Sequence, residues 1–245
     1  MNEAATEQHD IVGAETLSVI SAAGKFNKWT YETIKPYLKG NILEIGSGIG
    51  NISQFVINDF QQVTLSDYNK EYISMMKNKW NGKPSIKDFL SIDLQHPNFT
   101  SEYHQLQSKY DSIFLLNVIE HLADDHIAVQ NCRFMLKSGG HLILLAPAYS
   151  FLYSKLDKEL GHYRRYTTGT LSQPMMQNGF TILKTQYFNL LGTLGWFVSG
   201  KLLGTKQLGK NEMSTFNKLV PIAKLMDKLI GKSIGLSAIV VGKIN

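Results

Sequence analysis

The chain has 245 residues, 43% of them hydrophobic, and a formal net charge of +5. This length and apolar content suit one sizeable core, so we expect a single elaborated domain over residues 1–245. The one cysteine, Cys132, excludes a disulfide framework and a cysteine-based zinc site, and it fits a reducing cytoplasm. No run of about 18 apolar residues is present, which argues against a membrane-spanning helix.

The segment before the first predicted strand, residues 1–37, is expected to be an N-terminal helical cover. Its acidic start around Glu3 does not lead from basic residues into an apolar run, so it is not a signal peptide. We expect residues 1 to about 15 to be weakly ordered. Four aromatic residues either cover a cofactor or pack in the core: Phe26, Trp29, Tyr31 and Tyr37.

A glycine-rich turn, Gly46 to Gly50, follows the first predicted strand, Asn41 to Ile45. Glycines here let the backbone pass close to a ligand, because a Cβ would collide with it. The next predicted strand, Gln62 to Ser66, ends at Asp67, which can accept two hydrogen bonds from a ribose diol. The turn departs from the dinucleotide fingerprint at Asn51, which disfavours NAD. The pattern indicates a nucleoside cofactor, although aspartate also forms turns at strand ends.

Glu44 interrupts the apolar first strand. A buried carboxylate needs a partner, so we expect a cationic ligand group or backbone amides beside it.

Further apolar runs continue the alternation of strands and helices along the chain. Such alternation predicts an α/β fold with βαβ crossovers and a mostly parallel sheet, whose ligand lies at the carboxyl ends of the strands. These predicted strands are Asp111 to Leu116, His141 to Ala146, Phe180 to Tyr187 and Ser237 to Ile244.

The loop from Tyr149 to Tyr166 follows a predicted strand and therefore emerges at the ligand end of the sheet. The chain has 22 lysines and three arginines, and two of the three arginines, Arg164 and Arg165, are adjacent here. An arginine can grip a carboxylate or phosphate bidentately, which lysine cannot. Alternatively, one of them pairs with an acid of the loop such as Asp157. We expect one arginine to be structural and one to face the substrate.

Several spaced motifs resemble one bacterial branch of the class I S-adenosylmethionine-dependent methyltransferases, whose members are often encoded beside family 2 glycosyltransferases. The resemblance implies a Rossmann-like, seven-stranded, mostly parallel sheet with helices on both faces, a closing antiparallel hairpin and a helical C-terminal insertion at residues 188–235. It rests on the E-x-G-x-G-x-G pattern from Glu44, on Leu116 to Asp125, Leu136 to Gly140 and Ala146 to Tyr149, and on Leu156 to Tyr166.

The resemblance also assigns roles to residues around S-adenosylmethionine. Asp88 competes with Asp93 as the adenine contact, and Asn117 can also be the cap of the following helix. The implied cofactor contacts are Glu44, Gly46, Ser47 and Gly48 for the methionine part, Asp67 for the ribose, Tyr68, Asp93 and Leu94 for the adenine, and Asn117 and Val118 for the methyl-donor pocket.

Methyl transfer requires mainly that the nucleophile, methyl carbon and sulfur are aligned. A hydroxyl nucleophile needs a general base, and His162, His121 and Tyr163 are candidates. A carboxylate held by Arg164 or Arg165 needs none and gives a methyl ester. His121 can equally be a helix N-terminal contact. We expect O-methylation of a small-molecule or peptide acceptor, acidic if an arginine grips it, and no metal, because the Asp and His residues lack metal-ligand spacing.

The last 45 residues carry the excess positive charge, with eight lysines against two acids, and they contain no arginine. This composition argues against nucleic-acid binding and fits a membrane surface or an acidic substrate. Residues 188–235 are predicted to be a lid, an interfacial helix or an extra helical layer, with a break or helix start near Pro221. Two alternatives to an enzyme remain: a non-catalytic nucleoside-binding module, and a membrane-associated partner of a polyprenol-linked glycosyltransferase.

Overall fold

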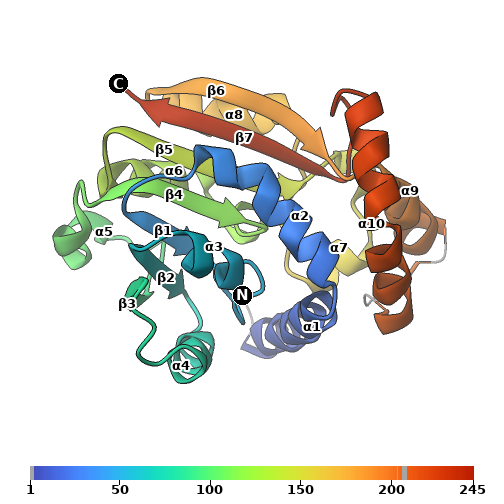
Figure 1. Cartoon of the computed structure of the whole chain (residues 1–245), viewed down its shortest axis with the longest axis horizontal. Helices are drawn as coiled ribbons and strands as arrows, with labels where there is room; N and C mark the ends of the chain where they lie inside the picture. Colours follow the sequence, from blue (N-terminus) through green and yellow to red (C-terminus); the bar gives the residue numbers. More distant parts are fainter. Residues whose placement is uncertain (1–2, 203, 206–208) are drawn as a thin grey trace.

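The computed structural model describes residues 3–202, 204, 205 and 209–245, and one seven-stranded sheet organises them (Figure 1). The strand order is β3-β2-β1-β4-β5-β7-β6, in which β7 runs opposite to the other six strands. This is the mostly parallel sheet with a closing hairpin that we expected. The strands are β1 Ile42–Ile45, β2 Val63–Asp67, β3 Ile86–Ser91, β4 Tyr110–Leu116, β5 Leu136–Pro147, β6 Phe180–Phe188 and β7 Ser237–Ile244.

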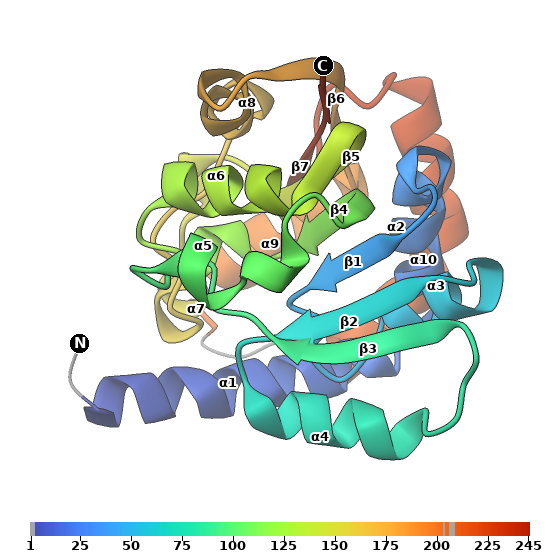
Figure 2. The same cartoon turned by 90° about the vertical axis from the view of Figure 1, so that its left-hand side faces the viewer.

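Helices cover both faces of the sheet, and α1 crosses below the ends of β2 and β3 (Figure 2). None of the described helices combines the length and the apolar character that crossing a membrane requires. The α-helices are α1 Glu3–Ser21, α2 Gly24–Ile34, α3 Ser53–Asp59, α4 Lys70–Lys79, α5 Phe99–Glu102, α6 Asp125–Met135, α7 Lys155–Glu159, α8 Thr168–Gln177, α9 Leu190–Trp196 and α10 Lys210–Leu229. Short 3-10 turns are η1 Lys35–Tyr37, η2 His104–Leu106, η3 Ile119–His121 and η4 Ser150–Leu152, and η5 Phe197–Leu202 is a π-helix.

The core has two halves because successive side chains of each strand point to opposite faces. On one face, Leu43 and its neighbours pack against α6 and α8, around buried residues such as Val129 and Met175. On the other face, Ile42 and its neighbours pack against α2, α3 and α4. The loops at the carboxyl ends of the parallel strands lie between these two layers, and that is the edge where the candidate site forms.

The C-terminal insertion packs on the sheet as a further helical layer. Val220 and Ala223 of α10 are buried against Trp29 of α2 and Phe188 of β6. The rings of Trp29 and Phe188 have their centroids 4.3 Å apart. Trp29 therefore takes the core-packing alternative, and the predicted aromatic cover over the cofactor is wrong for this residue.

Two local predictions were wrong, for strand β3 and for helix α10. Strand β3 was missed because it is an edge strand whose sequence, Ile86–Ser91, mixes polar and apolar residues and contains no buried residue. Helix α1 begins at Glu3, and the weak order expected for residues 1 to about 15 stays a prediction. Helix α10 continues through Pro221, because packing of its buried face outweighs the one backbone hydrogen bond that proline removes.

Candidate functional site

The glycine loop follows β1 in the conformation that the sequence predicts. Gly46, Gly48 and Gly50 have φ angles of 75°, 54° and 82°, in the left-handed region that favours glycine. A Cβ on Gly46 would collide with Cγ2 of Val118, so the loop passes tightly against the segment that follows β4. Ser47 ties the loop to β2, since its N–H donates to the carbonyl of Ser66 (2.9 Å).

Asp67, at the end of β2, contacts this loop directly. Its Oδ2 accepts the N–H of Gly48 (2.8 Å), and its Oδ1 accepts the N–H of Asn69 (2.9 Å). The second bond is an Asx turn, so the turn-forming interpretation holds, while the first places the carboxylate beside the loop as the ligand interpretation requires. Burial raises the pKa of Asp67, and the backbone hydrogen bonds counteract part of that rise.

The environment of Glu44 shows whether this site fits S-adenosylmethionine. The residue is 4% exposed, and its Oε2 has no hydrogen-bond partner among the described residues. Burial raises the pKa of Glu44 to about 8, against smaller opposing effects of the Ser53 and Ser47 hydroxyls. The cofactor carries an amino group on its methionine part, and an ammonium at this position would satisfy the orphaned oxygen. Glu44 and Asp67 therefore fit the cofactor.

The predicted adenine contacts lie at the ends of β2 and β3. Asp93 is two residues beyond the end of β3, whereas Asp88 lies inside the strand with an exposed side chain. This position favours Asp93 over Asp88, because ligands bind beyond the carboxyl ends of strands. Tyr68, next to Asp67, is 74% exposed, and Leu94 is buried. These adenine contacts stay predictions.

Asn117 and Val118 follow β4 at the same edge. Asn117 has a φ of 54°, and its N–H donates to the carbonyl of Leu145 (2.8 Å). It does not cap a helix: Val118 is the N-cap of η3, and Asp124 caps α6 through its side chain. The capping alternative for Asn117 is therefore wrong.

Helix α1 crosses the glycine loop from outside. A Cβ on Gly48 would lie 3.1 Å from Cδ1 of Leu17, and the Asn51 side-chain amide donates to the Leu17 carbonyl (3.0 Å). The role of residues 1–37 as a cover stays a prediction, and α1 is the part of this segment that lies over the loop.

The loop from Tyr149 to Tyr166 folds back onto the loop that follows β4. Tyr166 exchanges backbone hydrogen bonds with the end of β5: its N–H donates to Pro147 (2.9 Å), and its carbonyl accepts from Tyr149 (2.8 Å). The N–H of Tyr163 donates to the carbonyl of Glu120 (2.8 Å). Two motifs about 40 residues apart in the sequence thus form one surface beside the glycine loop.

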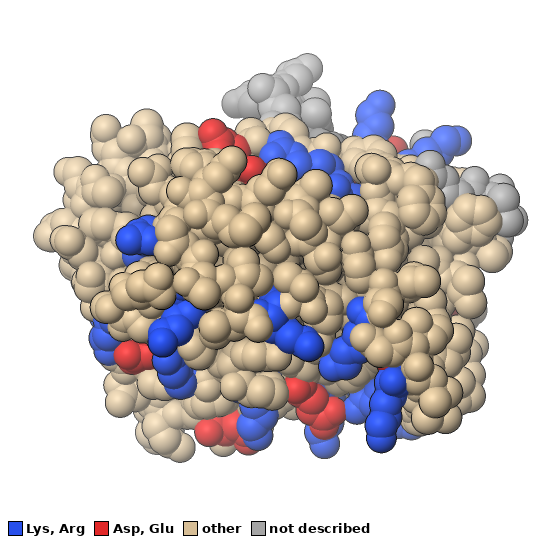
Figure 3. Space-filling view, turned by 90° about the horizontal axis from the view of Figure 1, so that it is seen from above, with Lys and Arg blue, Asp and Glu red and all other residues tan. Residues whose placement is uncertain are grey.

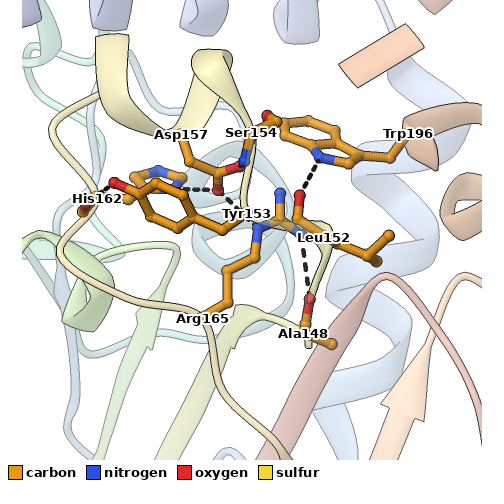
Figure 4. Close-up of polar contacts among 8 residues, drawn as sticks. All are labelled: Ala148, Leu152, Tyr153, Ser154, Asp157, His162, Arg165 and Trp196. Atoms are coloured by element: carbon orange, nitrogen blue, oxygen red, sulfur yellow. Dashed lines mark hydrogen bonds and ion pairs between the residues drawn. The ribbon is translucent and has the colours of Figure 1, made fainter. Parts of the chain in front are cut away.

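Asp157 organises the inside of this loop (Figure 4). Its Oδ1 accepts from Nδ1 of His162 (2.8 Å) and from Nε of Arg165 (2.7 Å), and its Oδ2 accepts from the backbone and hydroxyl of Ser154 (2.8 and 2.9 Å). Burial alone would raise the pKa of Asp157, but the bonds from His162 and Arg165 outweigh burial and hold it at about 2. The carboxylate is therefore charged and fully satisfied.

The two adjacent arginines have different surroundings. Arg165 is buried, donates to the carbonyl of Ala148 (3.1 Å), and lies with its guanidinium carbon 4.6 Å from the ring centroid of Trp196. It is the structural arginine that pairs with an acid of the loop. Arg164 is partly exposed and donates to the carbonyl of Ala123 (2.6 Å), with Asp125 at 3.2 Å. Its role toward a substrate anion stays a prediction.

A polar centre forms where the two loops meet. Glu120, His121 and His162 each offer one ligand atom, and these atoms lie within 4.8 Å of one another. The imidazoles of His121 and His162 have their centroids 4.7 Å apart and are nearly perpendicular. Tyr163, the third predicted base, follows His162 in the sequence, and its side chain is 46% exposed. Glu120 was not among the predicted site residues, and its only signal was an acid in an otherwise apolar turn beside His121.

The absence of a metal-ligand set had been predicted from spacing in the sequence alone. Folding brings three residues of ligand type together from two separate loops, so the expected absence of a metal stays a prediction.

Comparison with known proteins identifies the fold and the domain. The methyltransferase domain family matches residues 43–142, which include the glycine loop, Asp67 and the end of β4. Residues 43–142, about two fifths of the chain, are therefore similar to a methyltransferase domain. The cofactor is accordingly S-adenosylmethionine, and Glu44, Asp67 and the glycine loop are the residues on this chain that fit it.

Solved methyltransferases share the fold of the domain across most of the chain. An S-adenosylmethionine-dependent methyltransferase from Mesorhizobium loti is 13% identical, with a TM-score of 0.60 over 89% of this chain and 97% of that one. Geranyl diphosphate C-methyltransferase from Streptomyces coelicolor, solved with Mg2+, geranyl diphosphate and S-adenosyl-L-homocysteine, is 11% identical, with a TM-score of 0.61 over 89% and 77%.

Curated relatives are much longer proteins. Probable polyketide synthase 42 from Dictyostelium discoideum is 24% identical over 157 residues, which cover 56% of this chain and 6% of the relative. The chain thus spans only a small part of the length of such a relative.

Proposed function

We propose that the chain is an O-methyltransferase that acts on a hydroxyl or carboxylate of a small-molecule or peptide acceptor. The observation that carries this proposal is the hydrogen bond between Asp157 and Nδ1 of His162 (2.8 Å), beside Glu120 and His121. A charged Asp157 beside Nδ1 favours the tautomer of a neutral imidazole that carries its proton on Nδ1, and Nε2 would then be able to accept a proton. An oriented base at this edge of the sheet suits an oxygen nucleophile.

The reaction divides between the two halves of the site. When bound, S-adenosylmethionine supplies an electrophilic methyl group on a positively charged sulfur. Glu44 would hold the amino group and Asp67 the ribose hydroxyls, which fixes the direction of the methyl group. On the acceptor side, the oxygen–methyl bond forms while the sulfur–methyl bond breaks and its electron pair stays on sulfur. The hydroxyl proton passes to His162, or no proton moves if the acceptor is a carboxylate.

Isotope labelling tests the identity of the methylated atom. The full chain is incubated with methyl-labelled S-adenosylmethionine and a bacterial small-molecule extract, and the labelled products are purified. Hot hydriodic acid releases the methyl group of ethers and esters as methyl iodide, whereas mild alkali releases methanol from esters alone. Release by hydriodic acid is the expected result. Label that stays on carbon contradicts O-methylation and points to C-methylation.

A substitution then separates the two oxygen nucleophiles. For a hydroxyl acceptor, His162→Ala should lower turnover by about 100-fold or more, since a positioned base contributes about that much, with unchanged cofactor affinity. A small loss supports a carboxylate acceptor and ester formation. The exposed His126→Ala is the matched control, because it removes an imidazole outside the polar centre.

The setting of this activity is also proposed. A bacterial biosynthetic pathway in the cytoplasm is consistent with Cys132, a buried free thiol whose pKa is raised by burial and which suits reducing conditions. A cysteine in the core, away from the polar centre, gives no support to thiol-based chemistry at the acceptor.

A second proposal concerns the outer face of α10. Leu219, Ile222, Leu225 and Leu229 are 37%, 54%, 56% and 76% exposed at helical spacing, and lysines flank this row. Seen from above, the molecule carries many separate basic side chains and few acidic ones (Figure 3). An apolar row beside lysines suits the surface of an anionic membrane.

Vesicle binding tests this second proposal. Binding to vesicles that contain phosphatidylserine, lost at high salt and weakened by Leu225→Ser, is the expected result. Equal binding to neutral vesicles, or no binding to either kind, contradicts it. The same surface would suit the work of a membrane-associated partner of a polyprenol-linked glycosyltransferase.

A further inference from the structure

Glu120 differs from the other buried acids of the site because nothing hydrogen-bonds to its side chain. It is 0% exposed, and neither of its carboxylate oxygens has a partner among the described residues. Asp157, equally buried and close to it, receives four hydrogen bonds. A buried carboxylate without donors is unfavourable, so a bound cation would stabilise this group, and none of the described residues donates a hydrogen bond to it.

The neighbouring cation does not fill that position. Arg165 donates its Nε to Asp157 and its terminal nitrogen to the carbonyl of Ala148, and both groups are buried. The guanidinium is therefore held in another ion pair. What remains beside Glu120 is the pair of imidazoles of His121 and His162, whose nitrogens are ligand atoms for transition metals.

The orientation of His162 matches that of a metal-binding histidine. Its Nδ1 donates to Asp157 (2.8 Å), and its backbone carbonyl accepts from the hydroxyl of Tyr153 (2.7 Å). A carboxylate on one ring nitrogen fixes the tautomer and makes the other nitrogen a better ligand, an arrangement that recurs at zinc sites. Asp157 would play this supporting role.

We propose that Glu120, His121 and His162 bind a divalent transition-metal ion, with Zn2+ as the principal candidate. Two imidazoles and one carboxylate form a donor set that zinc uses in catalytic sites, where a fourth position stays open. Mg2+ and Ca2+ prefer oxygen ligands only and suit this set less well. Tetrahedral zinc needs its ligand atoms about 3.4 Å apart. The three atoms lie within 4.8 Å of one another, so side-chain adjustments of about 1.4 Å or less suffice.

The position of the centre gives the metal a use. Glu120 is two residues after Val118, and Val118 packs against Gly46 of the cofactor loop. The open coordination position would take water or an oxygen of the acceptor and lower the pKa of that oxygen. With Nε2 of His162 on the metal, His162 would not be the base, and the proton of this oxygen would pass to solvent. This use, unlike the binding itself, rests on the proposed O-methyltransferase function.

Metal binding is tested on the full chain after removal of metals with a chelator. Titration with Zn2+ should show one ion per chain with micromolar or tighter affinity, and Co2+ should give visible absorption bands typical of a tetrahedral site. Glu120→Gln, His162→Gln and His121→Ala should each weaken binding at least tenfold. Asp157→Asn should weaken it about 10- to 100-fold through the lost support of His162. Circular dichroism checks the fold of each variant, and His121→Ala, at a partly exposed position, keeps the test valid if a buried variant unfolds.

The control and the contradicting results are equally direct. His126→Ala should bind Zn2+ like the wild-type chain. No stoichiometric binding, or equal binding by all three ligand variants, overturns the metal site. Because these readouts need no acceptor, binding with no O-methyl product overturns the proposed function and leaves the site intact. O-methyl turnover that is unchanged by metal removal overturns the metal's use and leaves His162 as the base.

Discussion

Glu44 is expected to make the cofactor-free protein less stable at neutral pH. Burial raises its pKa from 4.5 to about 8. Between these values the folded protein holds a proton that the unfolded chain has released, so this group's contribution to stability falls as the pH rises from 4.5 to 8. A pH of 7 lies about 2.5 units above the pKa of this carboxyl in the unfolded chain. At about 1.4 kcal/mol per pH unit, burying the group lowers the free energy of unfolding by about 3 kcal/mol at pH 7.

The substitution Glu44→Gln removes this titration and keeps the shape of the side chain. We expect it to raise the free energy of unfolding by about 3 kcal/mol at pH 7 and by about 1 kcal/mol at pH 5. The variant should also lose S-adenosylmethionine affinity, because it no longer has a carboxylate for the amino group. Urea unfolding at both pH values, followed by circular dichroism, measures the first effect. The exposed Glu102→Gln is the control.

Two results would refute this reasoning. A Glu44→Gln chain with wild-type stability at pH 7 would mean that the buried carboxyl is not strained. A gain that is as large at pH 5 as at pH 7 would mean that it does not arise from proton binding.

Three further predictions follow from single contacts. Gly46→Ala should destabilise the chain by about 1–3 kcal/mol in urea unfolding and weaken cofactor binding, because its Cβ would meet Val118; a neutral effect would show that the loop has room. Arg165→Lys should lower the melting temperature by several degrees, because it loses buried hydrogen bonds to Asp157 and to the carbonyl of Ala148. Arg164→Lys should change the melting temperature little, because its ion pair with Asp125 is partly exposed. Equal shifts would contradict the assignment of Arg165 as the structural arginine. The lowered pKa of Asp157 gives about 2 kcal/mol of stability above pH 4, lost as the pH falls from about 4 to 2, and Asp157→Asn should remove that acid dependence in a stability titration.

The cofactor half of the site could be predicted because its signals are local. Glycines at 46, 48 and 50 require left-handed backbone, and an acid at the end of the next strand reaches them in any right-handed βαβ unit. The same alternation of apolar runs predicted the positions of six of the seven strands. The edge strand β3 was missed because pairing with β2, and not its own composition, makes it a strand.

The acceptor half could be predicted only in part. The loop from Tyr149 to Tyr166 was recognised by its arginines, and one arginine was expected to be structural, yet their burial depends on contacts with Trp196 and Asp125 from distant segments. Glu120 was missed because an acid beside a histidine carries no information about hydrogen bonds. Only the folded structure shows that its carboxylate has no hydrogen-bond partner among the described residues. Only folding brings it close to His162, which is 42 residues further along the chain.

Helix α10 shows the same limit for a long element. Its apolar spacing predicted a helix, and Pro221 predicted a break in it. The helix is continuous because Val220 and Ala223 are anchored in a core formed by α2 and β6, which sequence spacing does not describe.

Calorimetric titration of the full chain with S-adenosylmethionine, S-adenosylhomocysteine and NADH tests the central claim most directly. We predict micromolar binding of the two sulfur nucleosides and no binding of NADH. We also predict that Asp67→Ala loses binding, because it lacks the carboxylate that is expected to hold the ribose. Failure of both sulfur nucleosides to bind, or unchanged affinity in Asp67→Ala, would contradict the assignment of the cofactor site from Glu44 to Asp67.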